Sequence, residues 1–468
     1  MQRENPNPNP NSNNNNHDFI PPSLNKMGYM PVGKLTMTMS WPAMLSMFIH
    51  SLYSIVDSIF VATISESALT AVTLVFPIQM IMISLAVGTG VGVNSLIARR
   101  LGAHRFEEAD SAASHGLRLS LLNWLILGVF AIFFAPSYIQ LYTSTPYILQ
   151  EGTLYLQIVT GFSLFLFLQI NTEKVLQATG NMIFPMLCSL TGAIINIVGD
   201  ALLIFGLAGF PKMGLVGAAI ATIVGQIVAM GLGFFLLFAF KHEVKVKLKG
   251  FRWSKAIVRD IYLVGFPAII MQAIGSLMLF IINWILAGYS ETAVAVMGAY
   301  FRLQSFVFMP LFGLSQGVMP IIGYNFGAHN RERLMHSYFF ALKTGIIICS
   351  IGMVIFLAFP GELLGIFSAS QGMLEIGIPA LRIISIVFIP AAFGIISGTL
   401  FQATGHGLIS LGQSMIRQLV GIVPLAYLLI YLYGLSAIWW AWPLAEILSV
   451  IYTLIYMKKV YKKDLAHL

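Results

Sequence analysis

Two acidic side chains lie inside apolar stretches long enough to span a bilayer, and they are the residues best suited to chemistry in this sequence. Asp57 lies in the stretch 41–64, and Asp200 lies in a later one. A carboxylate at the centre of a membrane helix costs roughly 2.5–3.5 kcal/mol on insertion scales, so packing alone rarely explains it. Asn196 precedes Asp200 by one helical turn and shares its face. Together with Thr222 of the next stretch, these residues are expected at one depth.

Two carboxylates with amide and hydroxyl oxygens nearby would form a hard, anionic site for a cation. The four residues Asp57, Asn196, Asp200 and Thr222 could coordinate Na⁺ directly. Alternatively, the two carboxyl groups could share a proton, because close like charges favour protonation of one of them. The sequence leaves both alternatives open. For Asn196 and Thr222, hydrogen bonding between helices explains their presence equally well.

The composition identifies the surroundings of these residues as a membrane. The sequence of 468 residues is 57% hydrophobic and 9% charged, with a mean hydropathy of +0.83. Soluble domains carry about 25% charged residues. The net charge of +8 lies mostly near the ends of apolar segments, which is a topology signal and argues against nucleic acid as a partner. The lipid bilayer is the expected environment.

The apolar segments predict an all-α integral membrane protein with twelve spans, because each is about 20 residues or longer and none shows the period of a barrel strand. The segments are 36–62, 69–98, 111–135, 148–172, 183–207, 214–240, 258–287, 293–322, 335–360, 372–400, 408–432 and 435–457. Lys and Arg gather in the termini and alternate loops, which predicts a multi-pass protein of the cell membrane with both termini in the cytoplasm.

The two halves of the sequence repeat at an offset of 225 residues. The matching pairs are Trp41-Pro42-Ala43 with Phe266-Pro267-Ala268, Ser65-Glu66 with Ser290-Glu291, Leu101-Gly102-Ala103-His104 with Phe326-Gly327-Ala328-His329, and Gln177-Ala178-Thr179-Gly180 with Gln402-Ala403-Thr404-Gly405. Each half holds six spans, so both have the same orientation and a pseudo-two-fold axis lies along the membrane normal. Two facing lobes that rock against each other would give alternating access.

This repeat defines the expected domains and supplies a control for the acidic residues. The domains are a disordered cytoplasmic tail (1–35), an N-lobe (36–240), a cytoplasmic linker (241–257), a C-lobe (258–457) and a cytoplasmic C-terminal tail (458–468). In the second half, Ile282 stands in the place of Asp57 and Leu425 in that of Asp200. Because one lobe does without these acids, a functional role is favoured over a purely structural one.

Four further residues are functional candidates. Glu446 and Arg302 lie within spans of the C-lobe and could line a substrate cavity, although pairing with other charges or reaching to the interface explains them as well. Pro42 and Pro267 occupy matching positions in the first span of each lobe. A proline inside a helix frees a carbonyl group and kinks the axis, so these helices could bend during transport or hold a static kink.

No motif of a soluble catalytic site or a nucleotide-binding loop is present, so the protein is not expected to be an enzyme or an ATP-driven pump. No cofactor other than a coupling ion, Na⁺ or H⁺, is expected. A membrane-embedded enzyme or receptor would not require two halves of the same orientation.

Several stretches together resemble the multidrug and toxic compound extrusion (MATE) family of prokaryotic transporters. They are Ser54-Ile-Val-Asp57-Ser-Ile-Phe, the Leu101–His104 turn, Leu176-Gln-Ala-Thr-Gly180-Asn181, Asn196-Ile-Val-Gly-Asp200, Gly214-Leu-Val-Gly-Ala-Ala-Ile-Ala-Thr222, Gly313-Leu-Ser-Gln-Gly317 and Pro320-Ile-Ile-Gly-Tyr-Asn-Phe-Gly327-Ala328. The resemblance covers all twelve expected spans.

The resemblance implies two six-helix lobes in a V shape and cation-coupled antiport of amphipathic, often cationic aromatic drugs or toxins by alternating access. It places the family's N-lobe cation site on Asp57, Asn196, Asp200 and Thr222. The expected partners are small amphipathic molecules, and the protein is expected to work as a monomer. A lipid-linked saccharide flippase of the same superfamily is the alternative, for which Arg302, Arg382 and Arg417 would have to meet a pyrophosphate.

Overall fold

The structure is a computed structural model, and it describes residues 25–247, 250–367 and 369–468. Every secondary-structure element in these ranges is a helix, which confirms the expected all-α class. Among the described residues, eleven helices are long and apolar enough to span a membrane, and the number is twelve if one bent pair is counted as a single span. The structure thus supports eleven to twelve spans, in agreement with the twelve expected.

The first half of the chain forms six spans. Their elements are α1 (Lys26–Tyr29), which is too short to span, followed by α2 (Val32–Ile64), α3 (Glu66–Gly102), α4 (Phe106–Gln140), α5 (Pro146–Gly161), α6 (Leu164–Ala178), α7 (Ile183–Phe205), the short η1 (Leu207–Gly209) and α8 (Gly214–Ala239). The fourth span consists of α5 and α6, between which the helix is interrupted at Phe162 and Ser163.

The second half forms the other six spans. Its elements are α9 (Lys255–Ala287), α10 (Glu291–Gly327), α11 (Arg331–Ala358), α12 (Pro360–Gly365), α13 (Gln371–Ser385), α14 (Phe388–Ala403), α15 (Gly407–Met415), η2 (Ile416–Ile422), α16 (Val423–Tyr433), η3 (Leu435–Trp440), α17 (Ala441–Val460) and η4 (Tyr461–Leu465). The helices α13 and α14 are bent by 48° and together make one span. The segment η2 is a π-helix within the eleventh span.

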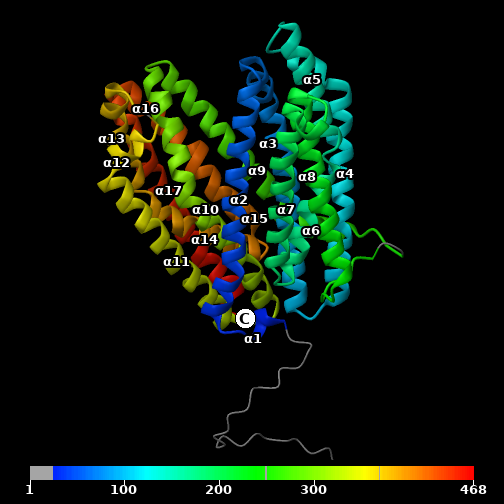
Figure 1. The fold of residues 1–468 in the computed structure, drawn as a ribbon. Helices are drawn as coiled ribbons and strands as arrows, with labels where there is room; N and C mark the ends of the chain where they lie inside the picture. Colours follow the sequence, from blue (N-terminus) through cyan, green and yellow to red (C-terminus); the bar gives the residue numbers. More distant parts are fainter. Residues whose placement is uncertain (1–24, 248–249, 368) are drawn as a thin grey trace, which may run out of the picture.

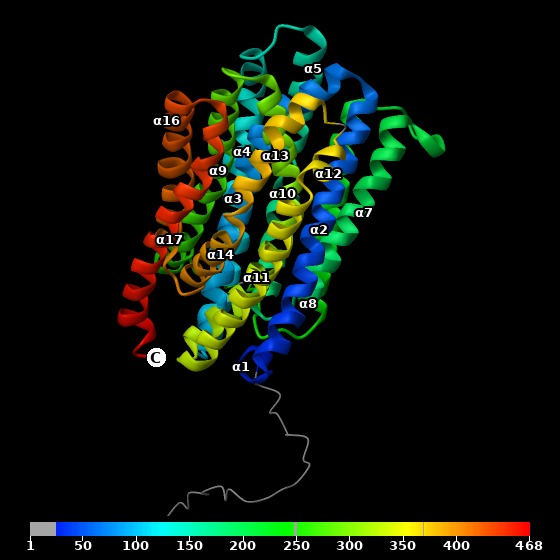
Figure 2. The same ribbon diagram turned by 90° about the vertical axis from the view of Figure 1, so that its left-hand side faces the viewer.

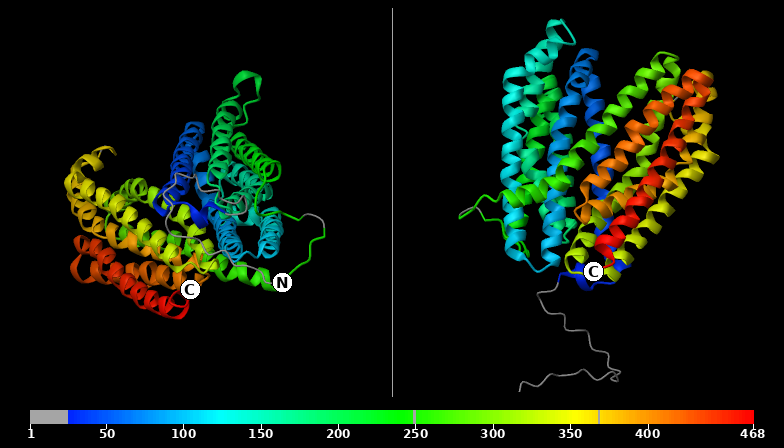
Figure 3. Two further views of the ribbon diagram at one scale, coloured as in Figure 1. Left: turned by 90° about the horizontal axis from the view of Figure 1, so that it is seen from below. Right: turned by 180° about the vertical axis from the view of Figure 1, so that it is seen from behind.

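The helices form two bundles that diverge toward one end and meet at the other, so the molecule has the outline of a V (Figure 1). The view from behind shows the same divergence of the blue-to-green bundle and the green-to-red bundle (Figure 3). The C-terminus and α1 both lie where the bundles meet (Figures 1 and 2). We call this the narrow end and the opposite one the wide end.

The internal repeat is visible in the local structure. Ser65 and Ser290 both cap a helix, accepting hydrogen bonds from Ala68 N and Ala293 N at 3.0 and 3.3 Å. In the two loops of sequence Gly-Ala-His, His104 and His329 have φ values of 56° and 53°. These loops are tight turns at the narrow end, as expected for short connections after long helices.

Polar contacts between the two bundles gather toward the narrow end. Ser95 Oγ of α3 donates to Gln402 O of α14 at 2.6 Å. Lys174 Nζ of α6 donates to Gln177 Oε1 at 2.9 Å and, across the boundary between the bundles, to Gln316 Oε1 of α10 at 2.7 Å. These bonds must break before the narrow end can open.

The N-terminal tail was expected to extend to residue 35, and this boundary is wrong. Residues 1–24 lie outside the described residues, but helical structure begins with α1, where Asn25 caps the helix and Met27 is fully buried. Asn25 Nδ2 donates to Glu243 Oε2 at 2.9 Å, and Asn325 Nδ2 of α10 donates to Met27 O at 3.2 Å. The segment is ordered because it packs against both halves of the chain.

Candidate functional site

Three helices of the first bundle bring together the four residues expected to form a cation site. Asp57 lies on α2, Asn196 and Asp200 lie one turn apart on α7, and Thr222 lies on α8. Asp200 is fully buried and Asn196 is 3% exposed, whereas Asp57 and Thr222 are half-buried.

Small residues allow α7 and α8 to approach closely enough for this arrangement. A Cβ atom at Gly225 of α8 would lie 2.8 Å from Gly192 O and 3.2 Å from Asn196 Cβ, and one at Gly199 of α7 would lie 3.0 Å from Ala221 Cβ. Glycine and alanine at such positions are typical of tightly packed membrane helices. The close approach places the Asn196 amide directly against Thr222.

Asn196 links the acid of α7 to α8. The amide is oriented so that each of its groups meets a complementary partner. In this orientation Asn196 Nδ2 donates to Asp200 Oδ2 at 3.2 Å, and Asn196 Oδ1 accepts from Thr222 N at 3.0 Å and from Thr222 Oγ1 at 3.2 Å. Asn196 therefore positions the Asp200 carboxyl group relative to α8.

Asp57 completes the cluster from α2. Its carboxyl group lies within hydrogen-bonding reach of Asp200. No N–H or O–H group of another described side chain or of the described backbone reaches Asp200 Oδ1. Two carboxylates this close repel each other unless a proton or a cation lies between them. In the described part of the chain, neither carboxyl group forms an ion pair with Lys, Arg or His.

Residues around the two carboxyl groups include three that sequence reasoning did not identify. Tyr53 of α2 approaches Thr222 and lies close to both acids, and Tyr155 of α5 lies near the same group. Gln79 Nε2 of α3 donates to the Tyr155 hydroxyl at 3.5 Å. Tyr53 precedes Asp57 by four residues, so its shared helix face was a usable signal. No local pattern pointed to Tyr155 or Gln79.

The donor atoms of this cluster are carboxylate, amide and hydroxyl oxygens, which suit a hard cation such as Na⁺ or a shared proton. Transition metals prefer imidazole and thiolate ligands. Within the described ranges, His, Cys, Asp and Glu side chains form no group of three or more that could hold a metal ion.

The other candidate residues lie elsewhere. Glu446 is buried in α17 at 4% exposure, whereas Arg302 of α10 is exposed. The charged neighbour of Glu446 is Arg417 of η2 rather than Arg302. The structure does not bring Glu446 and Arg302 to one surface, so the expectation that both line one substrate cavity has no geometric support.

The two prolines occupy equivalent positions inside long helices. Pro42 lies within α2 and Pro267 lies within α9. Ser46 Oγ donates to Pro42 O at 3.0 Å, and Pro267 is buried. Pro42 thus lies on the same helix as Asp57, four turns nearer the narrow end at about 3.6 residues per turn.

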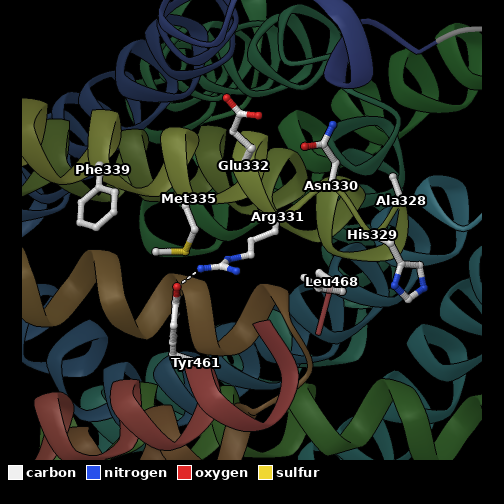
Figure 4. A pocket seen from close by; sticks show the side chains of 9 residues that line it. All are labelled: Ala328, His329, Asn330, Arg331, Glu332, Met335, Phe339, Tyr461 and Leu468. Carbon is white, nitrogen blue, oxygen red and sulfur yellow. Dashed lines mark hydrogen bonds between the residues drawn. The ribbon is translucent and has the colours of Figure 1, made fainter. Parts of the chain in front are cut away.

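A hollow of about 880 Å³ lies at the narrow end and shares no residue with the carboxylate cluster (Figure 4). It is lined by residues of the loop before α11, of α11 itself and of the C-terminal segment, and Arg331 donates to the Tyr461 hydroxyl across it. Its position at the meeting point of the bundles separates it from the acids of α2 and α7.

Comparison with known proteins gives a family match over most of the chain. The MatE family model matches residues 42–202 and again residues 267–428. The two matched stretches begin 225 positions apart, which is the offset of the internal repeat. The same family model thus matches both halves of the chain, which confirms the duplication read from the sequence.

Similar proteins are named as transporters. The chain is 28% identical over 417 residues to the multidrug export protein MepA of Staphylococcus saprophyticus, covering 89% of this chain and 91% of that protein. It is 28% identical over 428 residues to an FAD transporter of Shewanella oneidensis, covering 89% and 92%. A solved structure described as the outward-facing conformation of a multidrug resistance MATE family transporter of the MOP superfamily has a TM-score of 0.87 at 26% identity, covering 94% of this chain and 99% of that one.

Proposed function

The chain belongs to the MatE family of membrane transporters, and from this premise we propose that it exports amphipathic, often cationic aromatic compounds in exchange for an inward-moving cation, Na⁺ or H⁺. The observation that carries the coupling is the cluster of Asp57, Asn196, Asp200 and Thr222 in the first lobe. No catalytic role is assigned to any residue.

The chemistry of the cluster supports cation binding over a packing role. The two carboxyl groups lie within hydrogen-bonding reach of each other, and no Lys, Arg or His of the described residues forms an ion pair with them. A proton or Na⁺ would neutralise the negative charge that they carry. A charged acid inside the membrane has a high free energy. A bound cation therefore lowers the free energy of arrangements that keep Asp57 beside Asp200. Occupancy can thus bias α2 between two positions relative to α7.

The rest of the fold supports alternating access. The two lobes converge toward the narrow end and diverge toward the wide end, and their contacts include hydrogen bonds such as Lys174 to Gln316 that can break and re-form. We place the narrow end in the cytoplasm, together with both termini. In this arrangement the wide end faces outward, and Asp57 lies on a helix that also contains Pro42, where bending is easiest.

The proposal is tested by efflux of a fluorescent cationic dye from proteoliposomes. An imposed inward Na⁺ gradient and, separately, an imposed inward proton gradient should be compared for wild type, Asp57→Asn and Asp200→Asn. We expect at least one gradient to accelerate efflux in wild type and neither to do so in the two variants. Acceleration that persists in both variants would contradict the coupling site. Lipid-linked saccharide flipping without dye export would instead support the flippase alternative.

A further inference from the structure

The second lobe contains its own buried carboxyl group, Glu446 of α17, which the carboxylate cluster of the first lobe does not explain. Glu446 is 4% exposed, and no donor among the described residues hydrogen-bonds to its Oε1 atom. It forms no ion pair in the described ranges, although it lies within a span. A buried charged carboxylate without donors is strongly disfavoured.

Arg417 of η2 lies near enough to act electrostatically on Glu446, yet the two are not paired. Arg417 itself forms no hydrogen bond or ion pair with the described residues. Tyr300 of α10 also lies near Glu446, and its buried hydroxyl group has no hydrogen-bond partner among the described residues. If Glu446 were charged, approach to Arg417 would be favourable in this surrounding. Their separation is therefore expected of a neutral carboxyl group.

The other elements packed against α17 bring no competing charge to the carboxyl group. The helices α14 and α15 and the segment η3 contain no titratable side chain. On α13, Glu375 and Arg382 are exposed, and the tyrosines of α16 are exposed as well. On η4, Asp464 pairs with His406 at 3.3 Å, beyond the far end of α17. Arg417 and Tyr300 are thus the groups that govern Glu446.

The surroundings of Glu446 also allow a change of partner. A Cβ atom at Gly394 of α14 would lie 3.7 Å from Glu446 Oε1 and 2.7 Å from Gln413 Nε2, so glycine leaves room there for two polar ends. Arg417 lies in the π-helix Ile416–Ile422, and such segments frequently occur at functional sites. A local shift from π- to α-helical bonding would rotate Arg417 relative to α17.

We propose that Glu446 is a proton-binding carboxyl group of the second lobe, protonated in the arrangement seen here and paired with Arg417 once it releases its proton. Proton release would replace a neutral, unpaired group by an ion pair and would thereby pull η2 toward α17. A role of the Glu446–Arg417 ion pair in transport would rest on the proposed cation-coupled export. Proton binding by Glu446 does not depend on that function.

Infrared difference spectroscopy of the purified full-length protein in lipid nanodiscs tests proton binding without a gradient or a drug. The absorption of protonated carboxyl groups should fall as the pH is raised. In Glu446→Gln this fall should be smaller by the equivalent of one carboxyl group per protein. The matched control Glu375→Gln removes an exposed acid of the same lobe and shows whether the change is specific to the buried carboxyl group. A Glu446→Gln spectrum identical to that of wild type would overturn the proposal.

A second variant tests the pairing and remains informative if Glu446→Gln fails to fold. In Arg417→Gln the partner of the released carboxylate is lost, so one protonated carboxyl group should persist to a higher pH than in wild type. An unchanged pH dependence in Arg417→Gln would overturn the pairing. In Asp57→Asn, by contrast, the Glu446 signal should remain, so failure of the first-lobe coupling site and failure of this inference are separable.

Discussion

Two glycines, Gly102 of α3 and Gly327 of α10, are predicted to control closure of the narrow end. They occupy equivalent positions in the repeat, and each faces backbone of the opposite lobe. A Cβ atom at Gly102 would meet the Tyr324 carbonyl group, with its carbon at 2.7 Å and Ala328 N at 3.0 Å. A Cβ atom at Gly327 would meet the Arg99 carbonyl group, with its carbon at 2.8 Å and Ala103 N at 3.0 Å. Backbone atoms cannot swing aside as a flexible side chain can.

Substitution by alanine should therefore push the lobes apart at the narrow end. Overpacking by a methyl group typically costs about 1–3 kcal/mol. Because the clash exists only while the narrow end is closed, the cost falls on that conformation alone. At about 1.4 kcal/mol per tenfold change, each of Gly102→Ala and Gly327→Ala should shift the conformational equilibrium toward an open narrow end by roughly 5-fold to more than 100-fold.

The assay is a spin-label distance measurement across the narrow end, combined with dye efflux from proteoliposomes. Longer distances and slower efflux are expected for both variants. Gly298→Ala is the matched control, since it lies in the same helix as Gly327 and nothing lies within 4 Å of its added Cβ atom. The control also measures the intrinsic gain of helix stability from glycine to alanine. Distances in Gly102→Ala and Gly327→Ala that equal those of the control would refute the reasoning.

Two further predictions concern the same end of the molecule. Gln316→Leu removes one acceptor of the Lys174 ammonium group, so it should destabilise the closed arrangement by about 1.5–3 kcal/mol. Cysteines placed at the boundary between the lobes should then be labelled faster, and unchanged labelling would count against this contact. Burial raises the pKa of Glu243 despite the hydrogen bond from Asn25, so wild type should lose stability as the pH rises through that pKa, whereas Glu243→Gln should not. Thermal unfolding across pH measures this, and the same pH dependence of unfolding temperature in both proteins would contradict it.

The carboxylate cluster could be expected from the sequence because it depends on simple regularities. The helical period places Asn196 and Asp200 on one face, and the alternation of span directions places Asp57 and Thr222 at a similar depth. The repeat then shows which polar residues the second lobe lacks. These regularities constrain depth and face, but they do not determine which way the Asn196 amide faces or that Tyr155 joins the group from α5.

Other features arise from tertiary packing and leave little trace in the sequence. The interruption between α5 and α6 falls at Phe162 and Ser163, directly after Gly161. Glycine alone does not predict such a break, since α3 continues unbroken through Gly88. The π-helix around Arg417 contains Gly421 and is followed by Pro424, but a proline also lies inside the continuous helix α3, so these residues do not predict a π-helix. The helix α1 was missed because the low-complexity tail before it suggested disorder, whereas burial of Met27 between the two halves orders the segment. Local sequence patterns predict the spans well. They predict interruptions within the spans poorly, because packing against neighbouring helices determines where a helix is interrupted.

The most direct test of the coupling site is the flux of the cation itself. Proteoliposomes loaded with a cationic dye at equal Na⁺ and equal pH on both sides should take up Na⁺ or protons while the dye leaves, because antiport links the two movements. The account predicts that cation uptake accompanies dye efflux in wild type and disappears in Asp57→Asn, while a passive dye leak is unchanged. Cation uptake in Asp57→Asn at the same ratio to dye as in wild type would contradict it.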